Sequence, residues 1–183
     1  MNEVTLITGN KKKAEYFTKY IGVNIDHIDL DLDEIQSMSV AEVATHKVKQ
    51  AYDIIKKPVL VEDVSLEFPA LGNLPGPFVK FFLESLKLEE ICNLLNDKSR
   101  EAIARCVIGY YDGTDLKIFE GRINGTIAMT PSGERGFGWD HIFIPEGYTV
   151  TRSEMSEEDY AKTFLEFKRT DLVKKYLEEN NKK

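Results

Sequence analysis

The sequence has few cysteines, no long apolar run and no excess of positive charge, and each absence excludes a class of protein. Its 183 residues include two cysteines, Cys92 and Cys106, whose spacing fits neither a disulfide framework nor a metal site. Both lie in apolar stretches, so we expect them to be reduced cysteines in the core. No apolar run approaches the roughly 20 residues that a membrane-spanning helix needs.

The formal net charge of -7 excludes a further group of partners. General binders of nucleic acid or of acidic membranes need a basic face, so we expect neither partner. A small anionic substrate remains compatible, because a local lysine cluster or bound metal ions can supply positive charge. The segment Met1-Asn2-Glu3 carries an acid and leads into a predicted strand, unlike a signal peptide. We therefore expect a cytoplasmic protein.

Length and composition favour a globular domain. The chain is 42% hydrophobic and 30% charged, and its length suits one domain, either undivided or built as two lobes. Strand and helix patterns alternate in the first third, a strand-rich block follows, and helices close the chain. This order favours an α/β fold with a mixed central β-sheet and flanking helices. Strands are predicted at 4–7, 24–32, 58–61, 66–70, 101–111, 116–120, 123–129 and 142–145, and helices at 40–56, 88–95 and 171–179 and from residues 11, 78 and 156 onward.

The segment Thr8-Gly9-Asn10 separates the first strand from the first helix, with Asn10 as the predicted N-cap. A strand that leads through a glycine turn into a helix directs backbone N–H groups at an anion. Three lysines at positions 11–13 strengthen this interpretation, although the spacing is not that of a Walker P-loop. The alternative is a solvated lysine run on a surface helix.

Carboxylates follow the apolar strand 58–61 and gather before the second helix. Glu62 and Asp63 come directly after that strand, and Glu34 belongs to an acidic stretch. Strands that are apolar throughout are usually central, and ligands of α/β sheets bind at strand ends. Carboxylate oxygens there suit Mg²⁺, which keeps several waters and shares the remaining positions with substrate phosphates.

The segment Gly136-Phe137-Gly138-Trp139-Asp140 holds the single tryptophan between glycines. Glycine permits close backbone approach, and Trp offers a π-face and an N–H donor. This aromatic turn is therefore either a platform for a planar ligand or a loop that folds back into the core. Lysines for phosphate, carboxylates for Mg²⁺ and aromatic rings for a base together indicate a nucleoside phosphate as the ligand.

Five motifs lie in register between residue 4 and about residue 172. They are Thr8-Gly9-Asn10-Lys11-Lys12-Lys13, Glu34-Ile35-Gln36, Val61-Glu62-Asp63, the stretch from Leu74 to Phe82, and Phe137-Gly138-Trp139-Asp140 with Ile142-Phe143-Ile144-Pro145. Together they resemble the inosine triphosphate pyrophosphatase family. The resemblance implies hydrolysis of non-standard purine nucleoside triphosphates, such as ITP, dITP and XTP, to the monophosphate and pyrophosphate. It also implies a single domain, residues 1–183, with two lobes around an active-site cleft, a Mg²⁺ requirement and a homodimer.

The resemblance also implies residue roles. Asp63 and Lys13 would be catalytic, with Asp63 activating the attacking water, and Glu34 and Asp63 would bind Mg²⁺. No covalent nucleophile is expected. The residues that would bind the substrate are Thr8, Gly9, Asn10, Lys13, Lys80, Phe137, Gly138, Trp139, Asp140, Lys162 and Lys168.

Two departures from the family pattern bear on selectivity. Glu166-Phe167-Lys168 stand where the family has Ser-His-Arg, whose His and Arg read the 6-oxo group of the purine. Phe167 cannot donate the hydrogen bond of a His, and Arg169 would supply a guanidinium only if the register shifted by one. Val64 stands where a hydroxyl is common, which removes one phosphate contact. The alternatives are a pyrophosphatase with a changed base preference or a nucleotide-binding protein without catalysis.

Overall fold

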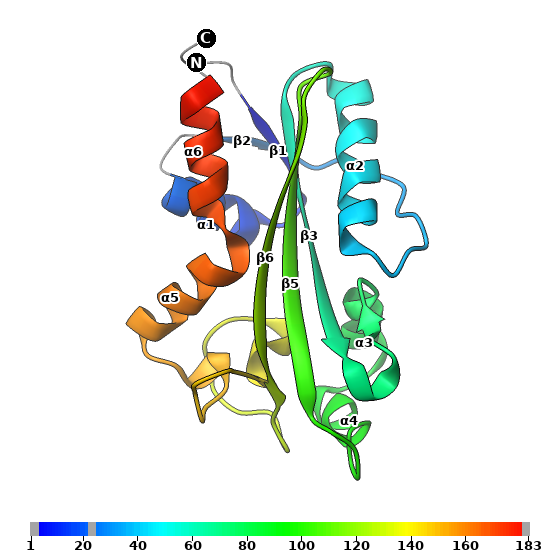
Figure 1. Ribbon diagram of the computed structural model, residues 1–183, viewed down its shortest axis with the longest axis vertical. Coiled ribbons are helices and arrows are strands. Elements are labelled where there is room, and N and C mark those ends of the chain that lie inside the picture. Colours follow the sequence, from blue (N-terminus) through cyan, green and yellow to red (C-terminus); the bar gives the residue numbers. More distant parts are fainter. Residues whose placement is uncertain (1–3, 22–24, 181–183) are drawn as a thin grey trace. The chain divides into compact units, whose positions relative to one another are not determined.

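The computed structural model describes residues 4–21 and 25–180, apart from the side chain of Lys12 (Figure 1). The expectation about Met1-Asn2-Glu3 lies outside these residues. The elements are β1 Thr5–Ile7, α1 Lys11–Ile21, β2 Asp26–Ile28, α2 Val40–Ile55, β3 Val59–Phe68, η1 Pro69–Leu71, β4 Leu74–Gly76, α3 Val79–Ser85, α4 Leu88–Asn93, β5 Glu101–Tyr111, β6 Leu116–Ile127, η2 Gly138–His141, β7 Phe143–Pro145, η3 Arg152–Glu154, α5 Glu157–Lys168 and α6 Thr170–Asn180.

The sheet is mixed, as the sequence predicts. Its strand order is β2-β1-β3-β5-β6-β7, and β4 pairs with β3. β1 is parallel to both β2 and β3, whereas the β3–β4 and β6–β7 pairs are antiparallel. The prediction of an α/β fold with a mixed sheet and flanking helices is therefore confirmed.

The chain divides into two compact units. Unit 1 is built from the described parts of Met1–Asp63, Cys106–Gly121 and Lys168–Lys183, and unit 2 from Val64–Arg105 and Arg122–Phe167. The strands β3, β5 and β6 each contribute residues to both units.

In unit 1, α2 covers one face of the sheet, and α1 and α6 lie on the other (Figure 1). The apolar stripe of α2, including Val40, Ala44 and Val48, packs against Val59 and Val61 of β3. Ser39 caps α2, with its side chain accepting a hydrogen bond from the Glu42 N–H at 3.3 Å. The predicted helix at 40–56 therefore agrees with α2 to within one residue, because its signals are local.

The strand β3 is longer than the sequence predicts. We expected a strand at 58–61 that stops at the carboxylates, but β3 continues through them to Phe68. β1 pairs with β3 only as far as Ile7 opposite Val61. Glu62 and Asp63 thus lie inside a strand but beyond the end of the β1 ladder. Similarly, β6 is continuous over 116–127, where two strands were predicted.

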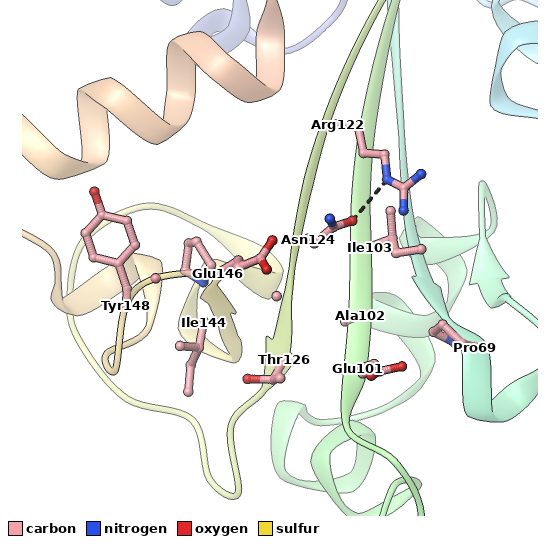
Figure 2. A pocket seen from close by; sticks show the side chains of 13 residues that line it. Pro69, Glu101, Ala102, Ile103, Arg122, Asn124, Thr126, Ile144, Glu146 and Tyr148 are labelled. Carbon is pink, nitrogen blue, oxygen red and sulfur yellow. Dashed lines mark hydrogen bonds between the residues drawn. The ribbon is translucent and has the colours of Figure 1, made fainter.

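Unit 2 contains a pocket of about 520 Å³ beside β5, β6 and β7 (Figure 2). Its polar walls include Glu101, Glu146 and Arg122, whose Nε donates to Asn124 Oδ1 at 3.0 Å. None of the residues that line this pocket belongs to the predicted substrate site. Among the described residues, no helix is both long and apolar enough to cross a bilayer.

Candidate functional site

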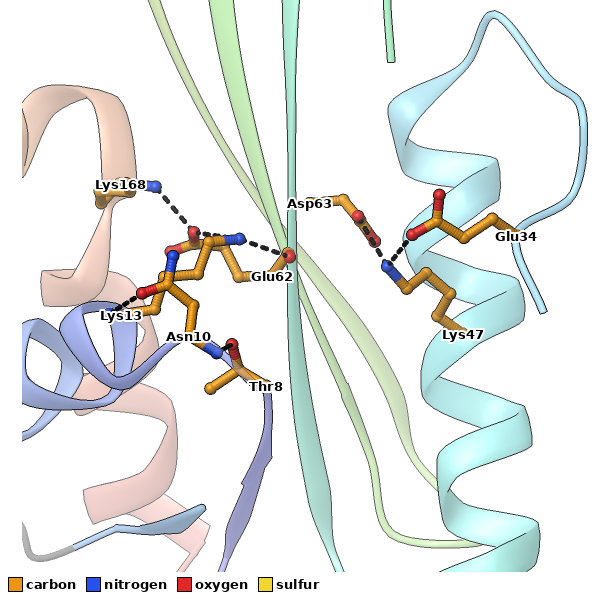
Figure 3. Close-up of polar contacts among 8 residues, drawn as sticks. All are labelled: Thr8, Asn10, Lys13, Glu34, Lys47, Glu62, Asp63 and Lys168. Carbon is orange, nitrogen blue, oxygen red and sulfur yellow. Dashed lines mark hydrogen bonds and ion pairs between the residues drawn. The ribbon is translucent and has the colours of Figure 1, made fainter. Parts of the chain in front are cut away.

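The turn Thr8-Gly9-Asn10 connects β1 to α1 in unit 1 and is held by its own side chains (Figure 3). Asn10 N–H donates to Thr8 Oγ1 at 3.1 Å, and Lys13 N–H donates to Asn10 Oδ1 at 3.3 Å. Asn10 therefore caps α1, as predicted. A Cβ on Gly9 would lie 2.6 Å from Oδ1 of Asp29, so only glycine fits there without a shift of Asp29.

The carboxylate of Glu62 is buried on the α1 face of β3 and binds two lysines. Its Oε1 lies 2.8 Å from Lys168 Nζ and 3.2 Å from Lys13 Nζ. Lys13 Nζ also donates to the backbone oxygen of Glu62 at 3.4 Å. This lysine therefore contacts β3 just past the last residue of β3 that pairs with β1. Burial alone would raise the pKa of Glu62, but the charges of Lys168 and Lys13 hold it below the ordinary value.

Asp63 faces the opposite way, because successive side chains of a strand point to opposite faces. On this face, Lys47 Nζ from α2 lies 3.0 Å from Oδ1 of Asp63 and 3.0 Å from Oε1 of Glu34 (Figure 3). Burial lowers the pKa of Lys47, but Asp63 and then Glu34 raise it, and the net result is a raised pKa. The two predicted metal ligands thus converge on one cationic group.

The donor set around Asp63 fits Mg²⁺. Oδ2 of Asp63 is buried and accepts no hydrogen bond from any residue that the structure describes. Glu34 contributes a second carboxylate, half of whose side chain is exposed. No cluster of three or more His, Cys, Asp or Glu side chains that could hold a metal was found among the described residues. Two carboxylates suffice for Mg²⁺, which takes its other ligands from water and phosphate.

The aromatic turn lies in unit 2, at η2. Trp139 is 7% exposed, with its ring edge-on to Phe143 and Phe167 at centroid distances of 5.5 and 5.6 Å. Phe137, by contrast, is 40% exposed. The packing of Trp139 agrees with the alternative that the aromatic turn folds back into the core. The ring of Phe137 is more accessible than that of Trp139. Base contact by either residue stays a prediction.

The Asp140 carboxylate is buried and fully used by neighbours in unit 2. Arg152 Nε donates to Oδ1 at 2.7 Å, and Tyr160 Oη donates to Oδ2 at 3.0 Å. The Phe137 N–H donates to the same Oδ2 at 3.2 Å. The Arg152 guanidinium also lies 5.9 Å from the centroid of Phe167, the ring that stands in place of the family histidine. Asp140 therefore organises the aromatic turn.

The predicted site residues belong to both units. Unit 1 brings together Lys13 and Lys168 through Glu62, and Glu34 and Asp63 through Lys47. Lys80 and Lys162 are exposed side chains of unit 2. Sequence reasoning missed three polar residues, Lys47, Glu62 as the partner of two lysines, and Arg152. Of these, only Lys47 could have been found from the sequence, because it is a cation on the predicted helix that follows Glu34.

Comparisons with known proteins match this arrangement of motifs. The model of the Ham1 family matches residues 4–165. Inosine triphosphate pyrophosphatase 2 of Trypanosoma cruzi is 47% identical over 163 residues, which are 86% of this chain and 83% of that protein. The inosine triphosphate pyrophosphatase of Yarrowia lipolytica is 40% identical over 184 residues, 96% of each chain.

A solved structure agrees with the sequence matches. The Ham1 protein of Staphylococcus aureus has a TM-score of 0.80 and 26% identity, with 97% of this chain and 100% of that chain covered. The resemblance seen in the sequence motifs is thereby confirmed. This chain belongs to the Ham1 family, together with proteins named inosine triphosphate pyrophosphatases.

Proposed function

We propose that this chain hydrolyses non-standard purine nucleoside triphosphates such as ITP, dITP and XTP, with Mg²⁺, to the monophosphate and pyrophosphate. The reaction would remove these compounds from the nucleotide pool of the cytoplasm. The observation that carries the proposal is the convergence of Glu34 and Asp63 on one cation, with Oδ2 of Asp63 buried and unpaired among the described residues.

The residues of unit 1 supply the parts of a phosphate-hydrolysing site. The backbone of the turn 8–10 and Lys13 would bind the triphosphate, since the N-terminus of α1 and an ammonium both favour anions. Glu34 and Asp63 would hold Mg²⁺, and Asp63 would accept a proton from the attacking water. When bound, Mg²⁺ would neutralise charge on the phosphates and on the departing pyrophosphate.

Lys47 would take part as well. Its ammonium stands where the two carboxylates converge, so metal binding requires it to leave that position. A displaced Lys47 on α2 would remain near the phosphates and add positive charge there. Lys80 and Lys162 remain predicted substrate-binding residues. The aromatic turn remains the predicted base contact, with Phe137 as its accessible ring.

The direct test is a substrate panel of ITP, dITP, XTP, dUTP, ATP and GTP, assayed for pyrophosphate with Mg²⁺ and with EDTA. We expect Mg²⁺-dependent turnover of ITP, dITP and XTP and little turnover of dUTP, ATP and GTP. Asp63→Asn should abolish it, whereas the control Asp53→Asn, at a largely exposed aspartate of α2, should not. Binding without turnover of any compound would support the alternative of a nucleotide-binding protein without catalysis. A preference for another base would support the third alternative.

The homodimer is part of the proposal. Its candidate interface is the apolar cluster Phe78, Phe81 and Phe82, which lies in α3 and at its N-cap, and the alternative is that this cluster packs in the core. Phe81 is 53% exposed, and the other two are partly buried. Light scattering on the wild type and on Phe81→Glu tests whether this cluster holds two chains together.

A further inference from the structure

Glu62 forms ion pairs with two lysines, although one lysine is enough to neutralise its charge. Lys168 is the closer partner, 2.8 Å from Oε1, with 7% of its side chain exposed. Lys13 lies 3.2 Å from the same oxygen, with 24% of its side chain exposed. The side chain of Glu62 itself is 3% exposed. The three charges sum to +1 in the interior of unit 1, beside the turn 8–10.

We propose that Lys168 is a positioning residue, which neutralises Glu62 so that Lys13 can move its ammonium from Glu62 to the triphosphate. The inference rests on the proposed function, and it gives Lys168 a role at the phosphates rather than at the base. Lys13 is the lysine that moves, because its contact with Glu62 is the longer one and its side chain is the more exposed. It also lies in the first turn of α1, next to the phosphate-binding turn 8–10. Lys168 stays on Glu62.

The reason is the cost of a buried carboxylate without a partner. Removing one member of a buried ion pair is strongly destabilising, because the other charge is left uncompensated. If Lys13 were the only lysine on Glu62, its transfer to a phosphate would leave such a charge behind. With Lys168 at 2.8 Å, Glu62 keeps a charged hydrogen bond throughout the transfer. Lys168 would therefore raise phosphate affinity without contacting the phosphate.

This mechanism predicts an unusual pattern among three variants. In Lys168→Met, Glu62 retains Lys13 alone, so phosphate binding should weaken by about tenfold or more. In the double variant Glu62→Gln/Lys168→Met, no carboxylate retains Lys13, and the affinity should return to within about threefold of the wild type. In Glu62→Gln alone, Lys13 is released as well, and the affinity should equal or exceed that of the wild type.

The probe is inorganic tripolyphosphate in EDTA, titrated by calorimetry, which isolates the lysines from the metal and from the base. For the best nucleotide with Mg²⁺, Lys168→Met should raise KM far more than it lowers kcat, and the double variant should restore KM. Circular dichroism and the Tm of each variant report folding. If Lys168→Met does not fold, Glu62→Gln decides the question alone, because weaker binding of tripolyphosphate by this variant overturns the proposal.

A double variant as weak as Lys168→Met also overturns it, since Lys168 would then contact the ligand or serve only folding. This outcome differs from failure of the proposed function. A wild type that binds tripolyphosphate with the expected order of variants but hydrolyses no nucleotide supports the lysine transfer and refutes the enzyme. If the wild type hydrolyses nucleotides but the double variant does not regain its affinity for tripolyphosphate, only the proposed movement of Lys13 is refuted. A wild type that does not bind tripolyphosphate overturns the lysine transfer as well.

Discussion

Arg152 and Asp140 form a buried ion pair in unit 2, with Nε of the arginine 2.7 Å from Oδ1 of the aspartate. The two residues are 2% and 4% exposed. Thr163 Oγ1 accepts a second hydrogen bond from the guanidinium at 3.0 Å. Because Asp140 also accepts the Phe137 N–H, the pair connects η3 to the backbone of the aromatic turn.

Arg152→Met should lower the free energy of unfolding by about 3–5 kcal/mol, the range for breaking a buried pair. The carboxylate of Asp140 would stay buried after the change, with its strongest donor gone. Urea denaturation measures the loss. The matched control is Lys56→Met, which breaks the exposed pair with Asp53, whose side chains are 64% and 73% exposed. It should cost less than about 1 kcal/mol. Equal losses in both variants would contradict this account.

A comparison of two glycines with positive φ distinguishes the cost of backbone strain from the cost of a side-chain clash. Gly136 (φ +79) and Gly72 (φ +66) both adopt the left-handed conformation that other residues rarely take. A Cβ at Gly136 would collide with Oδ2 of Asp140, whereas a Cβ at Gly72 meets nothing within 4 Å. Gly72→Ala should therefore cost about 1 kcal/mol of strain. Gly136→Ala should cost at least about 1 kcal/mol more, because Asp140 must shift as well.

Thermal and urea unfolding of both glycine variants provide the comparison. Since Asp140 fixes the aromatic turn, Gly136→Ala should also change the ratio of kcat/KM between ITP and ATP, and Gly72→Ala should not. Identical stability losses, with an unchanged substrate ratio, would show that the turn does not depend on the position of Asp140.

Lys47 forms ion pairs with both Glu34 and Asp63, so under the proposed function it would compete with Mg²⁺ for these carboxylates. Lys47→Met should tighten the binding of Mg²⁺ in the absence of nucleotide by about tenfold, because no ammonium then occupies the point where the carboxylates converge. Mg²⁺-dependent thermal stabilisation gives the apparent Kd. Lys49→Met is the charge-matched control, an exposed lysine of the same helix, and should leave the Kd nearly unchanged. Weaker Mg²⁺ binding in Lys47→Met would refute the competition.

The elements that the sequence predicts well are those with local signals. The helix at 40–56 and the Asn10 cap both depend on signals within a few residues, and each lies where expected. The candidate metal ligands also lie near one another. Their pairing could be predicted because the family resemblance implies it. The locations of Glu34 and Asp63 on one cation support the expectation, while metal binding itself stays a prediction.

The features that could not be predicted depend on contacts between distant segments. Lys168 reaches Glu62 from 106 residues away, and no periodicity in either segment indicates the pair. Arg152 is buried in spite of its charge, because Asp140 and Thr163 satisfy it. β3 continues through residues 62–65, between the two segments predicted as strands, and the pairing of β3 with β5 is a contact between segments far apart in the sequence.

The hairpin turn between β5 and β6 provides a prediction about pH. Oδ1 of Asp112 accepts hydrogen bonds from the backbone N–H groups of Asp115 and Thr114 at 2.7 and 2.9 Å. Partial burial would raise the pKa of Asp112, but these two N–H donors and the hydroxyl of Tyr110 lower it below the ordinary value. The ionised form is therefore favoured in the folded protein.

A carboxyl whose pKa is lower in the folded state stabilises the protein above its unfolded pKa of about 3.9, and the contribution disappears as pH falls through the folded pKa. Asp112→Asn keeps an acceptor oxygen in the turn but removes the charge. The difference in unfolding free energy between wild type and variant should thus be positive at about pH 6 and shrink towards about pH 2. Urea midpoints measured across this range give the difference, in which the titration of all other groups cancels. A difference that stays constant with pH would mean that the charge of Asp112 does not stabilise the turn.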